Sequence, residues 1–362
     1  MIRKILLACL FVSSLSYGQT LEPQLEKQEV LNSAILANDI HKAYSVDSLR
    51  QMTGYTNIYR SPEVGLTNMW GLYKNTASNV HEVVIRGSVN KGSSWLANYY
   101  AAMIPSQGKI QLDNETTVDY KLSDDERATV HAGWTIASLY LLQDIKPKID
   151  SLYKNNVKEL IISGHSQGAA IAFLLTANLI QMQQQGLLPQ DIQFKVYAIA
   201  PPKPGNMYFA YQYEKMTKNW SYAIINTQDW VPEVPPTTQT LRDFNEISPL
   251  SEGEVKQALK KLSWPKRIFA KAIFNKIKNP PEKSVKRSKK YLGSFVFSMV
   301  QTHLPELKEP TYSSNNNYAR CSNPIILDGQ ADPEYQREFH KPESIMTHHL
   351  PPAYLHLIEK QL

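Results

Sequence analysis

A serine between two glycines is the first feature of the chain that can do chemistry. The segment Gly164-His165-Ser166-Gln167-Gly168 fits the pattern G-x-S-x-G; the strand-like run VKELIISG leads into it, and the helix-like run QGAAIAFLL follows. A serine at a sharp strand-to-helix turn has a strained backbone, and side chains two positions away would collide with the neighbouring strand and helix. The glycines therefore expose the hydroxyl, and the first amides of the helix face the space where negative charge develops in a tetrahedral intermediate.

A serine hydroxyl becomes a nucleophile only with partners. An imidazole must take its proton, and a carboxylate must orient that imidazole. In the fold that carries this turn, the chain order is serine, acid, histidine. Asp229 follows the strand-like segment YAIINT, and four histidines lie near the end of the chain: His340, His348, His349 and His356. The required order is present, which favours a nucleophile over the alternative role of Ser166 as a helix cap.

The elements around these residues alternate between strand and helix. Strand patterns occur in NVHEVVIRGS (79–88), VKELIISG, QFKVYAIAPP and WSYAIINTQDW, and helical spacing follows a cap signal at Ser123. Parallel neighbours need crossover helices, which cover both faces of a sheet, and reactive groups gather at the carboxyl ends of the strands. The sequence therefore predicts an α/β fold with a mainly parallel sheet flanked by helices.

Together these segments resemble the class 3 lipase family of α/β-hydrolases. The resemblance lies in EVVIRGSV, VHAGW, ISGHSQGAA, YAIAPPKPGN, INTQDWVPEVPP and HHLPPAYLHL, and it spans residues 79–236 and 346–358. It implies the α/β-hydrolase fold, with a helical insertion before the C-terminal catalytic histidine. It also implies a Ser-His-Asp mechanism that requires no cofactor and no metal.

The resemblance assigns roles to individual residues. Ser166 corresponds to the nucleophile and Asp229 to the orienting acid, while the backbone amides of Ser88 and Gln167 correspond to the oxyanion hole. The Ser88 hydroxyl is a further candidate donor. The family usually has leucine at the position of Gln167 and glycine at that of Ala169, and neither change removes an amide donor.

The base is assigned from the same resemblance. The family's histidine tends to lie five residues before a tyrosine, and Tyr354 fits His349. His348 is the alternative, since spacing does not separate adjacent histidines. The gap of 120 residues from Asp229 (349 − 229) exceeds that of compact members, and an insertion at 245–310 accounts for it.

Three other polar residues are interpreted as structural. His131 precedes the serine in the chain and is expected to be a buried core histidine, and His165 is expected to pack inside the turn. Arg86 is expected to anchor the oxyanion loop. The segment Asn90–Pro105, which includes Trp95 and Tyr99, is either a lid that opens at a lipid surface or an ordinary helix packed on the core.

The first residues are typical of a secretory signal peptide. Arg3 and Lys4 precede an apolar run that is too short to span a bilayer, and small residues favour cleavage after residue 18. Lipidation at Cys9 is disfavoured because apolar residues continue beyond it. The expected mature chain, 19–362, is one α/β-hydrolase domain without a transmembrane helix, exported to the periplasm or secreted. It keeps one cysteine, so no intramolecular disulfide is possible.

Positive charge is concentrated in one segment. The formal net charge is +6, and residues 256–290 contain thirteen Lys or Arg against a single acid, Glu282. Aromatic and aliphatic residues at near-helical spacing alternate with these bases. This pattern fits peripheral contact with anionic membrane, or a solvated face of the helical insertion 245–310. Binding of nucleic acid is not expected, because no stacking platform or groove-reading motif is present.

The sequence thus predicts an exported serine hydrolase acting on carboxylic esters of lipids, either acylglycerols or phospholipids. One alternative is an esterase or deacylase for soluble or sugar-linked esters. Another is a catalytically silent surface-binding protein on the same scaffold. The triad of Ser166, Asp229 and His349 argues against the silent alternative.

Overall fold

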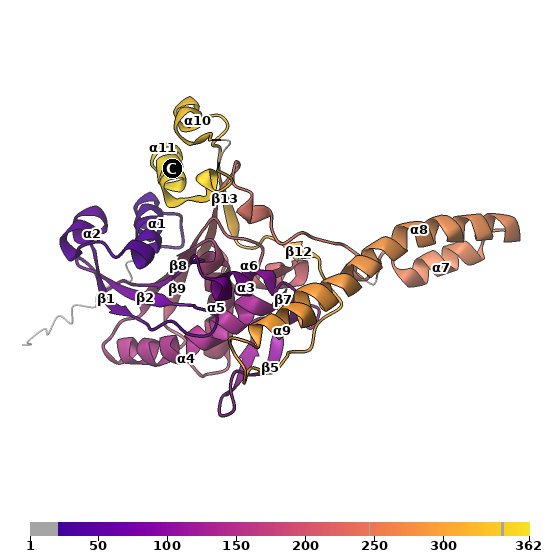
Figure 1. The fold of residues 1–362 in the computed structure, drawn as a ribbon, viewed down its shortest axis with the longest axis horizontal. Helices are drawn as coiled ribbons and strands as arrows, with labels where there is room; N and C mark the ends of the chain where they lie inside the picture. Colours follow the sequence, from indigo (N-terminus) through magenta and orange to yellow (C-terminus); the bar gives the residue numbers. More distant parts are fainter. Residues whose placement is uncertain (1–20, 246, 342–343) are drawn as a thin grey trace, which may run out of the picture.

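A seven-stranded sheet forms the centre of the computed structural model, which describes residues 21–245, 247–341 and 344–362. The predicted signal peptide, residues 1–18 with Cys9, lies outside the described residues. In spatial order the strands are β1 (Tyr55–Arg60), β2 (Trp70–Asn75), β3 (His81–Ile85), β8 (Glu159–His165), β9 (Gln193–Ile199), β11 (Ser221–Asn226) and β13 (Asn323–Leu327) (Figure 1).

Most of this sheet is parallel. From β3 to β13 each neighbouring pair runs in the same direction, whereas β1 and β2 are added antiparallel at one edge. The four strand patterns recognised in the sequence are β3, β8, β9 and β11, and they are consecutive in space. Their carboxyl ends therefore meet at one edge of the sheet, as predicted.

Helices cover both faces of the sheet. Successive strand residues point to opposite faces, so on β8 Leu160 and Ile162 pack in the cluster with α4 (Ala132–Lys154) and α5 (Gln167–Gln184). Ile161 points the other way, into the cluster with α1 (Lys27–Lys42) and α11 (Pro351–Gln361). Figure 1 shows α1 and α11 beside each other on one side of the sheet and α4 on the other.

The helix predicted to start at the Ser123 cap begins later, and that prediction was wrong. Thr129–His131 forms strand β7, which pairs with β4 (Met103–Pro105) and β10 (Gly205–Asn206). The true N-cap of α4 is His131, whose side chain accepts a hydrogen bond from the amide of Trp134. Pairing between strands distant in sequence overrides the local cap signal.

Smaller elements surround the main sheet. The strands are β12 (Tyr318–Ala319), which extends the β10-β7-β4 sheet, and the hairpin β5 (Gln107–Gln111) with β6 (Thr117–Lys121). The α-helices are α2 (Val46–Thr53), α3 (Gly92–Tyr99), α6 (Met207–Met216) and α10 (Pro333–Phe339). The 3-10 turns are η1 (Val231–Glu233), η2 (Leu241–Asp243) and η4 (Thr347–His349).

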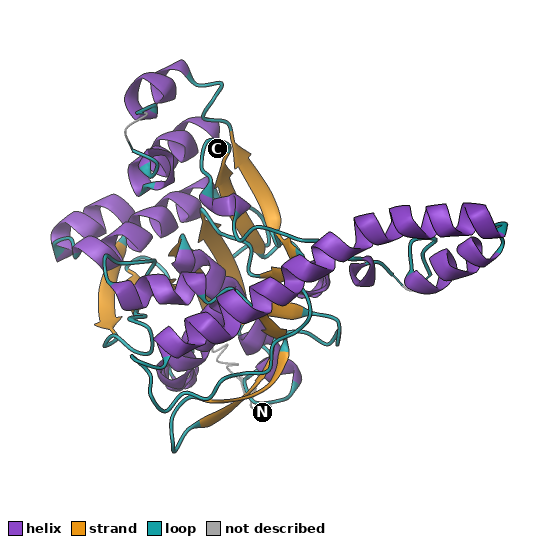
Figure 2. Cartoon of the chain, turned by 45° about the vertical axis from the view of Figure 1, so that its right-hand side comes forward, coloured by secondary structure: helices purple, strands orange, loops and turns teal. Residues whose placement is uncertain are grey.

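Between β11 and β13 the chain forms a helical excursion. It contains α7 (Glu252–Lys260), α8 (Trp264–Ser288), the π-helical η3 (Lys289–Phe295) and α9 (Val296–Val300). Figures 1 and 2 show α7 and most of α8 extending away from the body of the molecule, whereas α9 returns to it. Within the described ranges, no helix has the length and apolar character needed to cross a membrane.

A charged cluster lies beneath α1. Glu82 on β3 is completely buried, and Ser163 Oγ donates to one of its carboxylate oxygens over 2.6 Å. On β9 the buried Lys195 lies 2.5 Å from a carboxylate oxygen of Glu29 on α1. Burial, with a smaller contribution from Glu29, raises the pKa of Glu82 to about 7.

This cluster predicts a pH-dependent stability. The pKa of Glu82 is higher in the folded chain than its ordinary value of 4.5. Its contribution to the free energy of unfolding is therefore fully present below about pH 4.5 and is lost as pH rises through about 7. The loss is on the order of 3 kcal/mol. Glu82→Gln should abolish this pH-dependent loss of stability. When the pH is raised from about 5 to about 8, the free energy of unfolding of the variant should therefore increase relative to that of the parent chain.

Urea denaturation at both pH values measures this difference. Glu126→Gln, at an exposed position, is the matched control and should follow the parent chain. An unchanged pH dependence in Glu82→Gln would show that the buried carboxyl does not titrate in this range.

Candidate active site

The turn at Ser166 joins β8 to α5. Ser166 has φ 60° and ψ −127°, a conformation that non-glycine residues rarely adopt, and its amide donates to the carbonyl of Ile199 over 2.9 Å. A Cβ on Gly168 would lie 2.2 Å from the carbonyl oxygen of Ile85, and one on Gly164 would lie 2.5 Å from the backbone of Gly168. Both glycines are therefore required by close backbone approach, and the serine lies at the tip of the turn.

Asp229 and His349 meet behind this turn. The Nδ1 atom of His349 is 2.7 Å from Oδ2 of Asp229, and both side chains are buried. The same oxygen accepts from the Tyr354 hydroxyl over 2.8 Å, and Oδ1 accepts from the amide of Val231 over 2.9 Å. Because the carboxylate is an acceptor, Nδ1 of His349 carries the hydrogen, which leaves Nε2 as the basic nitrogen.

His348, the alternative base, occupies a different environment. Its Nδ1 lies 2.7 Å from the hydroxyl of Tyr335, and its carbonyl accepts from the Asn226 side chain over 3.0 Å. Burial, and then the neighbouring His340, lowers the pKa of His348. The structure therefore brings His349, and not His348, to the carboxylate.

The oxyanion candidates lie against each other. Ser88 follows β3, and its hydroxyl donates to Oε1 of Gln167 over 3.2 Å and accepts from the Asn98 side chain over 2.9 Å. Gln167 is the first residue of α5, and its Nε2 donates to the carbonyl of Ser94 over 3.4 Å. Glutamine in place of the family's leucine thus links the turn to α3, within the segment 90–105.

His165 contacts the base directly. Its Nε2 donates to the backbone carbonyl of His349 over 2.7 Å, and the two rings are 4.6 Å apart. Burial, with the neighbouring His349, lowers the pKa of His165 well below its ordinary value, so the ring is neutral. The residue expected only to pack inside the turn also fixes the backbone that carries His349.

The two other polar residues interpreted as structural lie apart from the triad. His131 is buried and stacks on Trp134 with ring centroids 3.6 Å apart, and burial lowers its pKa to about 3. Arg86 donates to Glu63 over 2.7 Å and to the carbonyl of Thr67 over 2.9 Å. These contacts tie the strand that precedes Ser88 to the neighbouring loop.

A cavity of about 620 Å³ contains the candidate site. Ser166, His349, Ser88 and Gln167 all line it. Apolar residues, several of them prolines, form most of the remaining wall, and the largest are Trp95, Tyr99, Trp134, Trp230, Val231, Leu292, Met346 and Leu350. Asp229 lies behind His349 rather than in the wall. The arrangement suits a nucleophile that opens onto an apolar chamber.

Part of the wall was not predicted from the sequence. Asn38, His41 and Lys42, at the end of α1, line the cavity. Surrounding protein, together with the charge of Arg86, lowers the pKa of His41 to about 4, so this ring is neutral near pH 7. The spacing of the three residues indicates one helix face, but no sequence signal indicates that this face covers the site.

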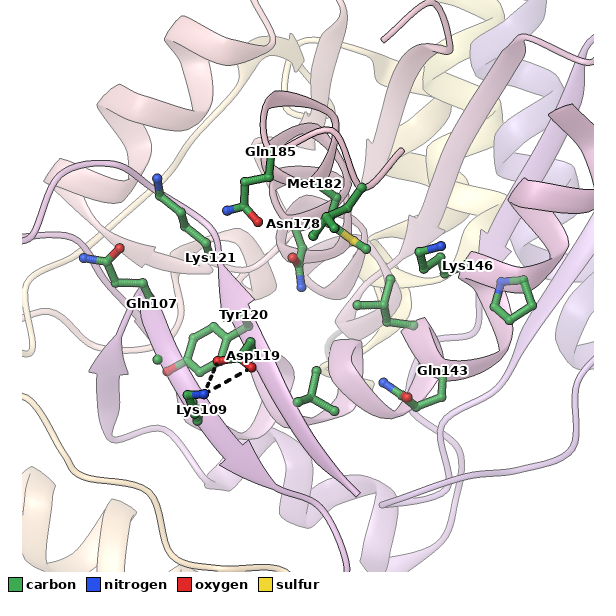
Figure 3. Close-up of a pocket in the computed structure, with 15 residues that line it drawn as sticks. Gln107, Lys109, Asp119, Tyr120, Lys121, Gln143, Lys146, Asn178, Met182 and Gln185 are labelled. Carbon is green, nitrogen blue, oxygen red and sulfur yellow. Dashed lines mark hydrogen bonds and ion pairs between the residues drawn. The ribbon is translucent and has the colours of Figure 1, made fainter. Parts of the chain in front are cut away.

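A second hollow, of about 730 Å³, contains none of the predicted catalytic residues. It lies between the hairpin β5–β6 and helices α4 and α5, and its charged rim is paired, as Figure 3 shows for Lys109 and Asp119. Lys121 and Lys146 pair with aspartates outside the lining. In the part of the chain that the structure describes, no group of three or more His, Cys, Asp or Glu is placed to hold a metal ion.

Comparisons with known proteins show what the chain is similar to. Residues 82–239 match the family model described as lipase (class 3). The chain is 30% identical over 112 residues to the secreted mono- and diacylglycerol lipase LIP4 of Malassezia restricta. The matched region covers 31% of this chain and 35% of that protein. It is 36% identical over 103 residues to secreted mono- and diacylglycerol lipase 3 of Gibberella zeae, and that match covers 28% of this chain and 29% of the relative.

These matches therefore span about a third of the length of the curated relatives. Among solved structures the chain is similar to lipase II from Rhizopus niveus, with 22% identity and a TM-score of 0.44, covering 58% of this chain and 75% of that one. The sheet order and the family match together confirm the predicted α/β-hydrolase fold.

The contacts of Asp229 predict the effect of one hydroxyl group. Tyr354→Phe removes a donor from the carboxylate that orients His349, and a hydrogen bond to a charged group typically contributes about 1.5–3 kcal/mol. We expect kcat for a soluble p-nitrophenyl ester to fall about tenfold or more, with little change in KM.

Tyr335→Phe is the matched control for this variant. Tyr335 bonds to Asn226, as Tyr354 does, but it contacts His348 instead of Asp229. Its kcat should stay within about threefold of the parent value. Equal losses in the two variants would indicate a general packing effect rather than support of the carboxylate.

Proposed function

We propose that this chain is an exported serine hydrolase that cleaves carboxylic ester bonds of lipids, because residues 82–239 match the family model of class 3 lipases. One observation carries the proposal. The hydrogen bond between His349 and Asp229 joins positions 120 residues apart, and it places that imidazole in the same cavity as Ser166.

The first half of the reaction transfers the acyl group to the enzyme. Nε2 of His349 takes the proton of the Ser166 hydroxyl as Oγ attacks the ester carbonyl, and Asp229 stabilises the imidazolium that forms. The carbonyl oxygen becomes an oxyanion beside the amides of Ser88 and Gln167. Collapse of the tetrahedral intermediate breaks the bond to the alkoxy group, which leaves as the alcohol with the proton from His349.

The second half releases the acid. His349 takes a proton from water while the water oxygen attacks the acyl carbonyl, and the same amides donate hydrogen bonds to the second oxyanion. The bond to Oγ then breaks, Ser166 regains its proton from His349, and the carboxylic acid leaves. Every proton is returned, so the cycle needs neither cofactor nor metal.

Lipid esters are the proposed substrates. The cavity is walled mainly by aromatic and aliphatic side chains, which suit an acyl chain, and relatives named mono- and diacylglycerol lipases support the assignment. The helix α3 supplies Trp95, Asn98 and Tyr99 to this wall. These contacts support the proposal that the segment Asn90–Pro105 covers the site and moves as a lid.

Export and a membrane-borne substrate belong to the same proposal. The predicted signal peptide at residues 1–18 motivates export, and relatives described as secreted support it. The domain extends over 19–362, with the helical insertion 245–310. Residues 256–290 would make peripheral contact with anionic membrane.

A probe that reacts with activated serines tests the nucleophile. We expect a fluorophosphonate to label Ser166, as mapped by mass spectrometry of peptides, and Ser166→Ala to abolish labelling. His349→Gln should lower kcat/KM by at least about 10³-fold, because the general base is lost. His348→Gln, the matched control one position away, should stay within a few-fold. The reverse ranking of the two variants would assign the base to His348.

Substrate panels separate the rival functions. Turnover of p-nitrophenyl esters of graded chain length and of emulsified acylglycerols or phospholipids should favour long acyl chains. A strict preference for short soluble esters would favour the esterase or deacylase alternative. Absence of any turnover that depends on Ser166 would favour a silent binding protein.

A further inference from the structure

The helical arm formed by residues 252–288 has a composition unlike the rest of the chain. It consists of α7 and α8 and extends away from the body of the molecule (Figures 1 and 2). Residues 252–288 contain eleven Lys or Arg and three acids, Glu252, Glu254 and Glu282. Glu282 lies 3.9 Å from Arg242, which is outside the arm, and the arm carries eight more basic than acidic residues (11 − 3).

The arm also exposes large apolar side chains. Trp264 is 73% exposed, Phe269 69% and Ile277 67%, and Ile268 and Ile273 are exposed as well. Phe269, Ile273 and Ile277 are spaced four residues apart, so they form one stripe along α8. Leaving such side chains in water is unfavourable by roughly 1.5–3 kcal/mol each relative to burial, so a stripe of them indicates a surface that is buried against something else.

The arm is continuous with the wall of the catalytic cavity. Beyond α8 the chain passes through η3, where Leu292 lines the cavity and its carbonyl accepts from the amide of Ala102 over 3.1 Å. In α9, Phe297 packs on Tyr100 with ring centroids 6.1 Å apart. The arm therefore has a fixed attachment beside the cavity.

Apolar exposure continues toward the cavity mouth. Tyr291, Phe295 and Met299, again four residues apart, are exposed on η3 and α9. Three large apolar residues that line the cavity are themselves exposed and lie on its rim: Tyr99, Trp230 and Leu350. Exposed apolar groups thus occur along the arm, along its attachment and around the opening.

We infer that the arm docks on an anionic lipid bilayer and thereby holds the rim of the catalytic cavity at the surface where lipid esters are found. The inference rests on the proposed function and names its partner. Lys and Arg heads interact with lipid phosphates while the Phe269–Ile273–Ile277 stripe enters the interface, which is the division of labour of an interfacial amphipathic helix.

Charge and chemistry favour a bilayer over other occupants. A second copy bound arm to arm would present the same positive excess, and the two arms would repel. Nucleic acid would satisfy the charge, but aliphatic side chains such as Ile268, Ile273 and Ile277 add nothing to phosphate contact and offer no stacking surface. An anionic bilayer satisfies both the bases and the apolar stripe.

Binding to vesicles tests the inference without catalysis. The full mature chain carrying Ser166→Ala is sedimented with vesicles of phosphatidylcholine alone or mixed with phosphatidylglycerol. We expect binding to the anionic vesicles to be at least about tenfold stronger. An apolar variant (Phe269→Ser, Ile273→Ser, Ile277→Ser) and a charge variant (Lys266→Gln, Lys271→Gln, Lys276→Gln) should each lower it by about tenfold or more.

Matched variants on the body of the protein control for composition. Val46→Ser, Ile58→Ser and Leu187→Ser change three exposed apolar residues, and Lys74→Gln, Lys154→Gln and Lys218→Gln remove the same charge. Both control sets should bind within about twofold of the parent. Arm variants that bind like these controls would overturn the inference, as would equal binding to neutral and anionic vesicles.

Two further outcomes would replace the bilayer with another partner. Arm-dependent self-association in analytical ultracentrifugation, without vesicle binding, would assign the stripe to a second copy. Arm-dependent binding of a labelled DNA duplex that is tighter than binding to anionic vesicles would assign the charge to nucleic acid.

Failure of the inference is distinguishable from failure of the proposed function. With Ser166 intact, the arm variants should hydrolyse a soluble p-nitrophenyl ester at the parent rate and lose about tenfold in turnover of esters held in anionic vesicles. If the arm variants hydrolysed the soluble ester normally and bound vesicles like the parent chain, only the docking role of the arm would be refuted. If neither the parent chain nor any variant hydrolysed the soluble ester while vesicle binding still depended on the arm, only the proposed hydrolase activity would be refuted.

Discussion

A single buried carboxylate organises the candidate site. The side chain of Asp229 is buried, so its charge is tolerable only because both of its oxygens accept hydrogen bonds. The donors come from three places: the amide of Val231 two residues on, the hydroxyl of Tyr354 on α11, and the ring of His349 in η4. The charge of this side chain therefore helps to bind the end of β11 to the C-terminal segment, together with the hydrogen bonds that Asn226 makes to Tyr354 and His348. The tautomer and orientation of the imidazole follow from the same contact.

That constraint explains how the chain tolerates a long excursion before His349. After the helical segment, β13 returns to the edge of the sheet and pairs in parallel with β11, with Asn226 opposite Leu327. The strand that ends just before Asp229 thus has as its neighbour the strand that leads to the histidine. The helices between them are looped out from an edge, so their length does not alter the geometry at the carboxylate. The excursion does contribute to the wall of the catalytic cavity, because its residue Leu292 lines that cavity.

The parts of the fold that were predictable from sequence are those set by local patterns. The turn at Ser166 is encoded by two glycines that admit close backbone contacts, and β8 is encoded by an apolar run that is buried on both faces. The start of α4 was not predictable in this way, because Thr129–His131 becomes a strand only through partners at 103–105 and at Gly205. The choice between His348 and His349 also depends on tertiary structure, because adjacent residues in a 3-10 turn point to different neighbours. Nothing local indicated that Asn38 and His41 would reach the cavity from α1.

The structure also separates the requirements of chemistry from those of reaching an insoluble substrate. The polar groups around Ser166 are held by backbone amides and by short hydrogen bonds within the packed body, where small displacements would be costly. The exposed apolar groups lie on the rim and on a helix that projects into solvent, joined to the body beside the cavity. Because most of α8 extends away from the body that holds the site, the energies of docking through the arm and of catalysis should be nearly additive. Changes along α8 can then tune which surfaces the protein meets without disturbing the carboxylate, the imidazole or the strained turn.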